Sequence, residues 1–310
     1  MIGAVDIGGT KIATGLVDED GRVIGRAAFP TLAAGPDEAL SRIVASLRDA
    51  CRRGGVSLSG VGIACTGPVD PAGGTVGKAD LLPGWEGLDL VGPLKDEFLV
   101  PVTLENDANA AALAEAHWGV GRGSTRFLYV TVSTGIGGGL ILDGQLYRGV
   151  DGSHPEIGHH VVDPSGPRCS CGARGCWEAL ASGPALVKWA RENAGAGDQL
   201  PDDLSAEDLC RRAERGDPLA VRALDREGYY LGLGLANLMT ILCPEKIALG
   251  GGLIQSAPLF LPRARRVIRE NCALVPSEKM VVEIASQVVD VALLGAARVW
   301  QCTFGKGEGN

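Results

Sequence analysis

The stretch Asp6-Ile7-Gly8-Gly9-Thr10-Lys11 decides the fold, because the pattern around it occurs twice in the chain. It follows the apolar run 2–5 and leads into a second run at 12–17. An Asp20-Gly21 pair then separates that run from a third at 22–27. Asp-Gly between extended runs favours a hairpin turn, since type I′ turns need positive φ. The pattern predicts three consecutive strands with a glycine loop after the first.

The second copy begins about 125 residues later, at the apolar run 127–132. Its loop reads Ser133-Thr134-Gly135-Ile136-Gly137-Gly138-Gly139, and an Asp143-Gly144 pair separates the runs 140–142 and 145–148. Two copies predict two similarly built halves, each with a backbone loop. If the halves face each other, the loops line one cleft, which is the usual place for a ligand.

Along the rest of the chain, apolar runs of strand length alternate with segments of helical periodicity, which is typical of an α/β protein. Further strands are expected at 61–65, 102–104, 246–249 and 280–284, and helices at 36–53, 107–118, 219–242 and 258–271. No low-complexity linker splits the sequence, so we expect several segments to cross between the halves.

The composition limits the classes of protein that fit. The chain has 310 residues, 46 of them glycine, and a formal net charge of −8. This length predicts about two domains, and the acidic charge disfavours nucleic acid and anionic membranes as partners. The most apolar stretch, 229–243, is shorter than the roughly 20 residues of a membrane helix. Nine cysteines, six of them isolated, and a start without a signal-peptide pattern predict a cytoplasmic protein.

The glycine loops predict anion binding, because consecutive backbone N–H groups with little side-chain bulk form a concave site for phosphate. Thr10, Lys11 and Thr134 add hydroxyl groups and a positive charge. A third cluster, Gly250-Gly251-Gly252, follows a predicted strand and lets a ring or a phosphate approach the backbone. Plain turns are the alternative for each loop. Neither the dinucleotide fingerprint nor the P-loop pattern occurs in the sequence.

A metal centre is predicted by His159, Cys169, Cys171 and Cys176. Three thiolates and one imidazole are a typical ligand set for structural zinc, and the intervening prolines and glycines let the chain wrap an ion. His160 or His154 could replace His159 as the fourth ligand. Buried free cysteines are the alternative reading of the cluster.

Carboxylates and amides form the third group of candidate residues. Asn106-Asp107 stands where a predicted strand ends and a helix begins, so the pair can cap the helix or place a base at the carboxyl end of a strand. Glu156 and Glu178 flank the proposed zinc ligands, and a metal would hold them in place. Carboxylates gathered around one point suit a polyhydroxylated ligand, since they accept hydrogen bonds from hydroxyl groups.

Taken together, these motifs resemble the ROK family (repressor, open reading frame, kinase). The resemblance extends in the family's order to Leu293-Leu294-Gly295-Ala296-Ala297, nearly the whole chain. It rests on Asp6-Ile7-Gly8-Gly9-Thr10-Lys11, Thr66-Gly67-Pro68, Glu105-Asn106-Asp107, Ser133-Thr134-Gly135-Ile136-Gly137-Gly138-Gly139, Glu156-Ile157-Gly158-His159 and Cys169-Ser170-Cys171-Gly172-Ala173-Arg174-Gly175-Cys176-Trp177-Glu178.

The resemblance implies an actin-like, ribonuclease-H-like fold of two lobes with duplicated mixed sheets. The smaller lobe would comprise residues 1–118 with about 292–310, and the larger lobe, 119–291, would hold the zinc site and a sugar-binding loop. ATP with Mg²⁺ would lie between the lobes and a hexose deeper in the cleft. Family likeness also implies a homodimer or a higher homo-oligomer.

The same likeness assigns roles to residues. Asp107 would be the general base that takes the proton of the attacking sugar hydroxyl. The zinc histidine would orient the sugar through its other ring nitrogen. Sugar contacts would come from Gly67, Asn106, Asp107, Glu156, His159 and Glu178. ATP contacts would come from Asp6, Gly8, Gly9, Thr10, Lys11, Thr134, Gly135, Gly137, Gly138, Gly250, Gly251 and Gly252.

The implied activity is phosphorylation of the 6-hydroxyl of a hexose, with glucose as the first choice. The set of Glu156, His159 and Glu178 resembles glucokinases and also the N-acetylmannosamine and N-acetylglucosamine kinases, while His154-Pro155-Glu156 resembles some fructokinases. The segment 80–85 departs from the glucokinase pattern, in which an asparagine commonly stands near the position of Leu81. The phosphate donor, ATP or polyphosphate, is open.

Two other functions follow from the family. Its repressors carry an N-terminal helix-turn-helix, and Asp6 lies too close to the start for one to precede it, so DNA binding is not expected. A catalytically silent sugar sensor is the alternative from a different class, and the presence of Asp107 and both glycine loops argues against it.

Overall fold

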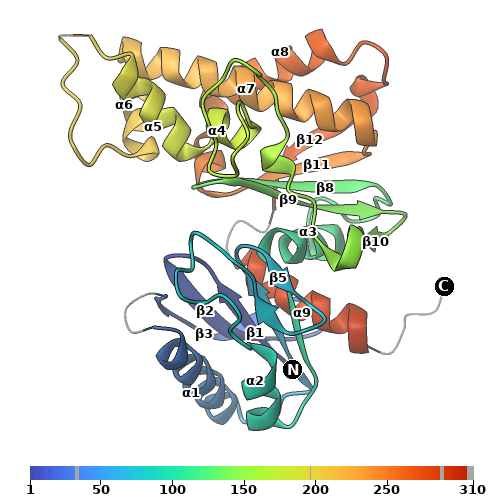
Figure 1. Ribbon diagram of the computed structural model, residues 1–310. Coiled ribbons are helices and arrows are strands. Elements are labelled where there is room, and N and C mark those ends of the chain that lie inside the picture. Colours follow the sequence, from blue (N-terminus) through green and yellow to red (C-terminus); the bar gives the residue numbers. More distant parts are fainter. Residues whose placement is uncertain (32–34, 196, 287–289, 306–310) are drawn as a thin grey trace. The chain divides into compact units, whose positions relative to one another are not determined.

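The computed structural model describes residues 1–31, 35–195, 197–286 and 290–305. Grouped by their contacts, the residues form two compact units (Figure 1). The first contains Met1–Thr125, Gly139–Pro155 and Ser286–Asn310, and the second contains Arg126–Gly138 and Glu156–Ala285. The segment Gly139–Pro155 therefore groups with the first unit, whereas the sequence-based boundary placed it in the larger lobe. Gly139 explains this, since a Cβ on it would meet Ala108 and Ala112 of the first unit.

The first five-stranded sheet has the order β3-β2-β1-β4-β7. Its first three strands are antiparallel neighbours, and β4 and β7 run parallel to β1. The strands are β1 Ile2–Ile7, β2 Lys11–Val17, β3 Val23–Pro30, β4 Gly60–Cys65 and β7 Val102–Asn106. A separate hairpin pairs β5 Val69–Asp70 with β6 Thr75–Val76.

The second five-stranded sheet repeats this order as β10-β9-β8-β11-β12, which confirms the predicted duplication. Here too, β11 is parallel to both β8 and β12, while β10 is antiparallel to β9. The strands are β8 Phe127–Val132, β9 Ile136–Leu142, β10 Gln145–Leu146, β11 Lys246–Gly250 and β12 Val281–Ile284.

The two Asp-Gly turns differ from each other. Asp143 and Gly144 both have positive φ, 51° and 76°, as a type I′ turn requires. At the first site only Gly21 has positive φ, and the loop spans residues 18–22. The predicted hairpin forms there, since β2 and β3 pair antiparallel. Its turn is not of type I′, and the Asp18 carboxylate accepts a hydrogen bond from Arg22 N at 2.8 Å in a longer loop.

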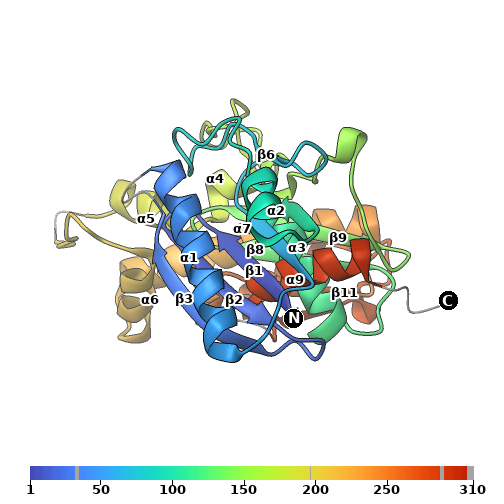
Figure 2. The same cartoon turned by 90° about the horizontal axis from the view of Figure 1, so that it is seen from below.

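Helices cover both faces of the first sheet. Helix α1, Pro36–Gly54, packs on β2 and β3 (Figures 1 and 2), where Ile43 and Leu47 join the core. Helix α9, Val291–Phe304, packs on β1 and β4 and against α3, Asp107–Trp118. Glycine makes the approach of α9 possible, because a Cβ on Gly62 would overlap the Ala296 carbonyl. A shorter helix, α2, spans Val91–Phe98.

In the second unit, the long helix α7, Pro218–Leu242, contacts α4, α5, α6 and α8. The predicted helix 258–271 begins later than expected, at Leu261, because Pro258 lies in a preceding 3-10 segment. The other helices here are α4 Trp177–Ala181, α5 Gly183–Glu192, α6 Ala206–Glu214 and α8 Leu261–Asn271, and the 3-10 segments of the chain are η1 Val150–Gly152, η2 Ile157–His159, η3 Gly252–Leu259 and η4 Ser277–Lys279. Within the described ranges, no helix has the length and apolar character needed to cross a membrane.

Candidate active site and metal centre

The first glycine loop joins β1 to β2 in the first unit. Gly8 N donates to Lys11 O at 3.0 Å, and the Thr31 hydroxyl donates to Gly8 O at 2.6 Å, so the loop is closed by its own backbone and by β3's end. A Cβ on Gly9 would press on Leu81. The side chains of Thr10 and Lys11 are exposed. The Thr10 hydroxyl and the positively charged Lys11 side chain therefore lie beside a glycine turn without bulky side chains, as expected for phosphate binding.

Two acids of the first unit, Asp6 and Asp107, have raised pKa values. Burial and, next, the negative charge of Asp107 raise the pKa of Asp6 from 3.8 to about 7, while Lys11 opposes the rise. Burial also raises the pKa of Asp107. Hydrogen bonds from Ala108 N and the Thr66 hydroxyl, and the charge of His154, act in the opposite direction. A carboxyl group with a raised pKa accepts a proton more readily near neutral pH, which suits a general base.

Asp107 stands at the junction of β7 and α3, as predicted. Asn106 is the helix cap, because its Oδ1 accepts from Ala108 N at 2.9 Å and from Asn109 N at 3.2 Å. Its Nδ2 donates to Gly67 O at 3.2 Å, which brings the predicted sugar residues Gly67 and Asn106 together. The capping role belongs to Asn106, so the Asp107 carboxylate is not required as the cap residue.

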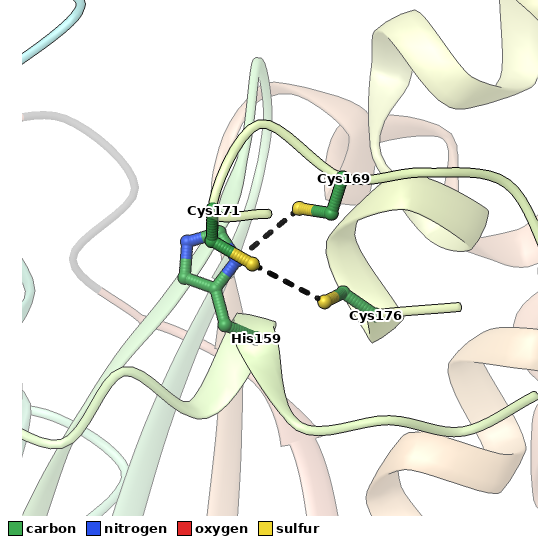
Figure 3. A group of neighbouring side chains, drawn as sticks. All are labelled: His159, Cys169, Cys171 and Cys176. Carbon is green, nitrogen blue, oxygen red and sulfur yellow. Dashed lines mark hydrogen bonds between the residues drawn. The ribbon is translucent and has the colours of Figure 1, made fainter. Parts of the chain in front are cut away.

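The predicted zinc ligands gather in the second unit (Figure 3). The ligand atoms of His159, Cys169, Cys171 and Cys176 all lie within 4.8 Å of one another. Cys169 Sγ is 3.5 Å from His159 Nδ1, and Cys171 Sγ is 3.5 Å from Cys176 Sγ. Zn–S bonds of about 2.3 Å in a tetrahedron place sulfur atoms about 3.8 Å apart, so the residues present fit a zinc ion.

His159 is the histidine of this cluster. His160 Nδ1 instead lies 2.5 Å from Ile157 O, and its ring contacts Trp177 with centroids 5.4 Å apart. His154 lies in the first unit. Among the described residues, His159 is therefore the histidine that lies with the three cysteines, whereas His160 is engaged with Ile157 and Trp177.

The carboxylates of Glu156 and Glu178 lie beside the other nitrogen of His159. His159 Nε2 is 4.0 Å from Glu156 Oε2 and 4.0 Å from Glu178 Oε1. Glu178 is also held by its Oε2, which accepts from Ile136 N at 2.9 Å. Three residues predicted to contact a sugar thus form one polar group on the cluster, with acceptors that fit neighbouring hydroxyls.

The second glycine loop and the third glycine cluster share a cavity of about 1240 Å³ in the second unit. Ser133 and Thr134 line it from the loop, and Gly252 lines it from the turn after β11. Gly251 has φ of 92°, and a Cβ there would meet Val132 O, so glycine is needed at this turn. The cavity lining does not include the other predicted ATP residues of this unit, Gly135, Gly137, Gly138, Gly250 and Gly251.

Sequence reasoning missed the far wall of this cavity. Helices α5 and α6 supply apolar, thiol and charged side chains there, including Val187, Lys188, Arg191, Cys210 and Arg211. The only sequence signal was amphipathic periodicity, which predicts a helix but not that one of its sides faces a cavity. These residues are therefore candidates for contacts to the parts of a ligand that extend beyond the glycine loops.

The fold and these two groups of residues define an α/β protein of the actin-like, ribonuclease-H-like class, with duplicated mixed sheets and paired glycine loops. The model of the ROK family matches residues 2–302, and the chain belongs to this family.

Curated and solved relatives agree with this assignment. The glucokinase of Streptomyces coelicolor is 36% identical over 273 residues, which cover 84% of this chain and 85% of the relative. The crystal structure of the ROK hexokinase of Thermus thermophilus has a TM-score of 0.83 at 34% identity and covers 99% of both chains. The ROK glucokinase of Streptomyces griseus, in complex with glucose and AMPPNP, has a TM-score of 0.82 at 34% identity, covering 96% of this chain and 98% of the relative.

Proposed function

We propose that this chain is an ATP-dependent hexose kinase that phosphorylates the 6-hydroxyl of glucose. The observation that carries the proposal is Asp107, a partly buried carboxylate of raised pKa at the carboxyl end of β7. It occurs in a chain whose family relatives include a glucokinase that binds glucose and an ATP analogue.

In the proposed reaction, Asp107 accepts the proton of the 6-hydroxyl as the oxygen attacks the γ-phosphorus. The bond from that phosphorus to the β,γ-bridging oxygen breaks, and ADP leaves. Phosphoryl transfer needs mainly positioning and charge neutralisation, so one well-placed base suffices. Mg²⁺ bound to ATP supplies neutralisation of the phosphate charge.

The sugar contacts are assigned within each unit. In the first, they are Gly67, Asn106 and Asp107; Asn106 donates a hydrogen bond to Gly67 O, and Asp107 follows Asn106 in the chain. In the second, Glu156 and Glu178 flank His159 Nε2. We assign zinc to His159, Cys169, Cys171 and Cys176, where it would hold the ring of His159 and so orient its free nitrogen.

The phosphate-binding groups are likewise assigned within each unit. Asp6, Gly8, Gly9, Thr10 and Lys11 form the first group. In the second unit, Thr134 and Gly252 border the cavity of about 1240 Å³, which is large enough for a nucleoside. Gly135, Gly137, Gly138, Gly250 and Gly251 would shape the backbone on which the phosphates rest. The cavity is lined by both apolar and polar residues and lies beside a proposed phosphate loop. It therefore favours ATP over polyphosphate as the donor, because polyphosphate has no nucleobase that could occupy it.

We further propose a homodimer or higher homo-oligomer located in the cytoplasm, with metabolic partners limited to hexose and nucleotide. Light scattering at dilute and concentrated protein tests the oligomer, and a monomer mass at both would contradict it.

A coupled ADP-release assay tests the activity. The purified chain is given Mg²⁺ and ATP with glucose, N-acetylmannosamine, N-acetylglucosamine, mannose, fructose or allose. We expect kcat/KM to be highest for glucose. A higher value for another sugar would replace glucose as the substrate. No turnover with any sugar, with either ATP or polyphosphate as donor, would favour a sugar sensor.

A further inference from the structure

Glu105 is a buried acid that the proposed reaction does not use. Its side chain is 1% exposed, and it lies in β7, two residues before Asp107. A carboxylate removed from water is retained only where charges or hydrogen bonds compensate its desolvation. Its partners therefore indicate why the charge is kept at this place.

One oxygen of Glu105 holds the start of α3. Oε1 accepts from Asn106 N at 2.9 Å and from Asn109 Nδ2 at 2.9 Å. These two donors lie on either side of Asp107 in the chain. The carboxylate thus spans the turn on which the proposed base is mounted and limits how that turn can move.

The other oxygen is bound by Arg148. Arg148 Nε donates to Glu105 Oε2 at 2.9 Å, and Nη2 donates to the same oxygen. Arg148 follows β10 by two residues and belongs to the same unit as Glu105. The Arg148 side chain is 38% exposed, so the free-energy cost of desolvation falls mainly on the buried carboxylate of Glu105. Two N–H groups on one carboxylate also define the orientation of the arginine side chain.

The segment that begins at Arg148 also carries a charge that acts on Asp107. Six residues further on, His154 lies close enough for its charge to act on the Asp107 carboxyl. The chain leaves the first unit directly afterwards, at Pro155. Arg148 therefore anchors one end of a short segment, and His154 near its other end carries a charge that lowers the pKa of Asp107.

We propose that Glu105 and Arg148 form a positioning pair, which holds the first turn of α3 from one side and the loop 149–155 from the other, so that Asp107 keeps the orientation needed to receive a proton. Neither residue is placed in contact with substrate. The proposal rests on the proposed function, because it concerns the base of that reaction.

The test compares Arg148→Met with Arg48→Met. Arg48 of α1 pairs with Glu97 of α2 in the same unit and so provides a matched loss of an arginine–glutamate pair on other helices. kcat is measured with glucose and is divided by the number of AMPPNP sites found by calorimetry, which removes the effect of unfolded protein. We expect Arg148→Met to lower kcat about ten- to hundredfold, as small displacements of a catalytic group do. KM for ATP should change less than about twofold, because the substitution removes no group that the proposal places in contact with ATP.

Two further variants separate geometry from charge. Arg148→Lys keeps the charge without the planar fork, and we expect it to restore only part of kcat. The double variant Glu105→Gln/Arg148→Met leaves no unpaired charge buried and keeps an acceptor for Asn106 N, so it guards against misfolding of the single variant. We expect its kcat to stay at least about fivefold below wild type, because the loop remains unanchored.

A kcat per binding site within about twofold of wild type, in Arg148→Met or in the double variant, would overturn the proposal. Hydrogen exchange provides a readout that does not depend on activity. Amides of residues 106–109 should exchange faster in Arg148→Met and at the wild-type rate in Arg48→Met. Unchanged exchange in both would also overturn the positioning role. If wild type phosphorylates no sugar, the proposed function fails, and the exchange result alone decides on the pair.

Discussion

Asp107→Asn should remove proton transfer while it preserves the local structure around the proposed base. Asparagine has nearly the same shape, and its Oδ1 can still accept from Ala108 N, which lies 2.8 Å from Asp107 Oδ1. The helix cap is contributed by Asn106, so it is untouched. Burial raises the pKa of Asp107, which means that the charged carboxylate opposes folding. The variant should therefore unfold at the same or a higher temperature than wild type.

The expected magnitude follows from the loss of a general base. Such a base contributes about 10²–10⁴ in rate, which corresponds to roughly 3–5 kcal/mol in the activation free energy. The assay is coupled ADP release at saturating glucose and Mg²⁺-ATP, together with calorimetry for the dissociation constant of glucose. We expect kcat to fall by about 10²–10⁴ and the dissociation constant to change by less than about threefold, since asparagine can still bond to a hydroxyl.

Three outcomes would refute the reasoning. A kcat within about threefold of wild type would show that another group takes the proton. A large loss of glucose binding would make Asp107 a binding residue first. A marked fall in melting temperature would assign it a structural role. Asp96→Asn, an exposed aspartate of α2 in the same unit, is the control and should behave as wild type.

Other residues give further tests. In the folded protein the pKa of Asp6 is raised from 3.8 to about 7. Between these pH values the folded chain keeps a proton that the unfolded chain releases. The free energy of unfolding that this group contributes is therefore fully present below pH 3.8 and is lost as the pH rises to about 7. Asp6→Asn should therefore raise the urea-measured free energy of unfolding by up to roughly 4 kcal/mol at pH 8 and hardly at pH 4; equal effects at both would contradict this. Cys171→Ser should contain less zinc than the value of about one ion per chain expected for wild type, and it should melt at a lower temperature. A wild-type protein that is free of metal and still fully stable would exclude the zinc site. Gly62→Ala should cost about 1–3 kcal/mol, because its Cβ would overlap Ala296, whereas Gly54→Ala, which meets Val56 at an ordinary 3.4 Å, should not.

Local patterns predicted the duplicated strands well. Both glycine loops follow a buried strand and precede another, and this order is legible because strand periodicity and turn residues act over short distances. Asp107 was placed correctly at the start of α3 for the same reason. The first Asp-Gly hairpin was also placed correctly, but its turn type was not, since the carboxylate of Asp18 binds the backbone and a single sequence does not reveal such a hydrogen bond.

Long-range partners were beyond the reach of sequence patterns. The sequence around Arg148 does not indicate that its guanidinium group binds Glu105, which lies 43 positions away in the chain. The wall of the cavity that α5 and α6 provide is likewise set by how helices pack. The cluster of His159, Cys169, Cys171 and Cys176 is the exception, because three thiols and one imidazole within one short segment form a recognisable ligand pattern for zinc, and the structure brings their ligand atoms within 4.8 Å of one another.

The two duplicated sheets carry different residues at the ends of equivalent strands. Both sheets have the same strand order, so the fifth strand of each ends at an equivalent place. In the first sheet this strand, β7, ends with Asn106 and is followed directly by Asp107. In the second, β12 ends at Ile284 and is followed by Ala285, which has no proton-accepting side chain. The fourth strand shows the reverse. There β11 runs into Gly250, Gly251 and Gly252, with Gly252 beside the large cavity, whereas β4 ends at Cys65. In the proposed reaction a single base is needed, and the duplicated sheet supplies a carboxylate at the end of its fifth strand only once. Copies of a single sheet could therefore diverge at the ends of their strands, where ligands bind, and keep their interior patterns.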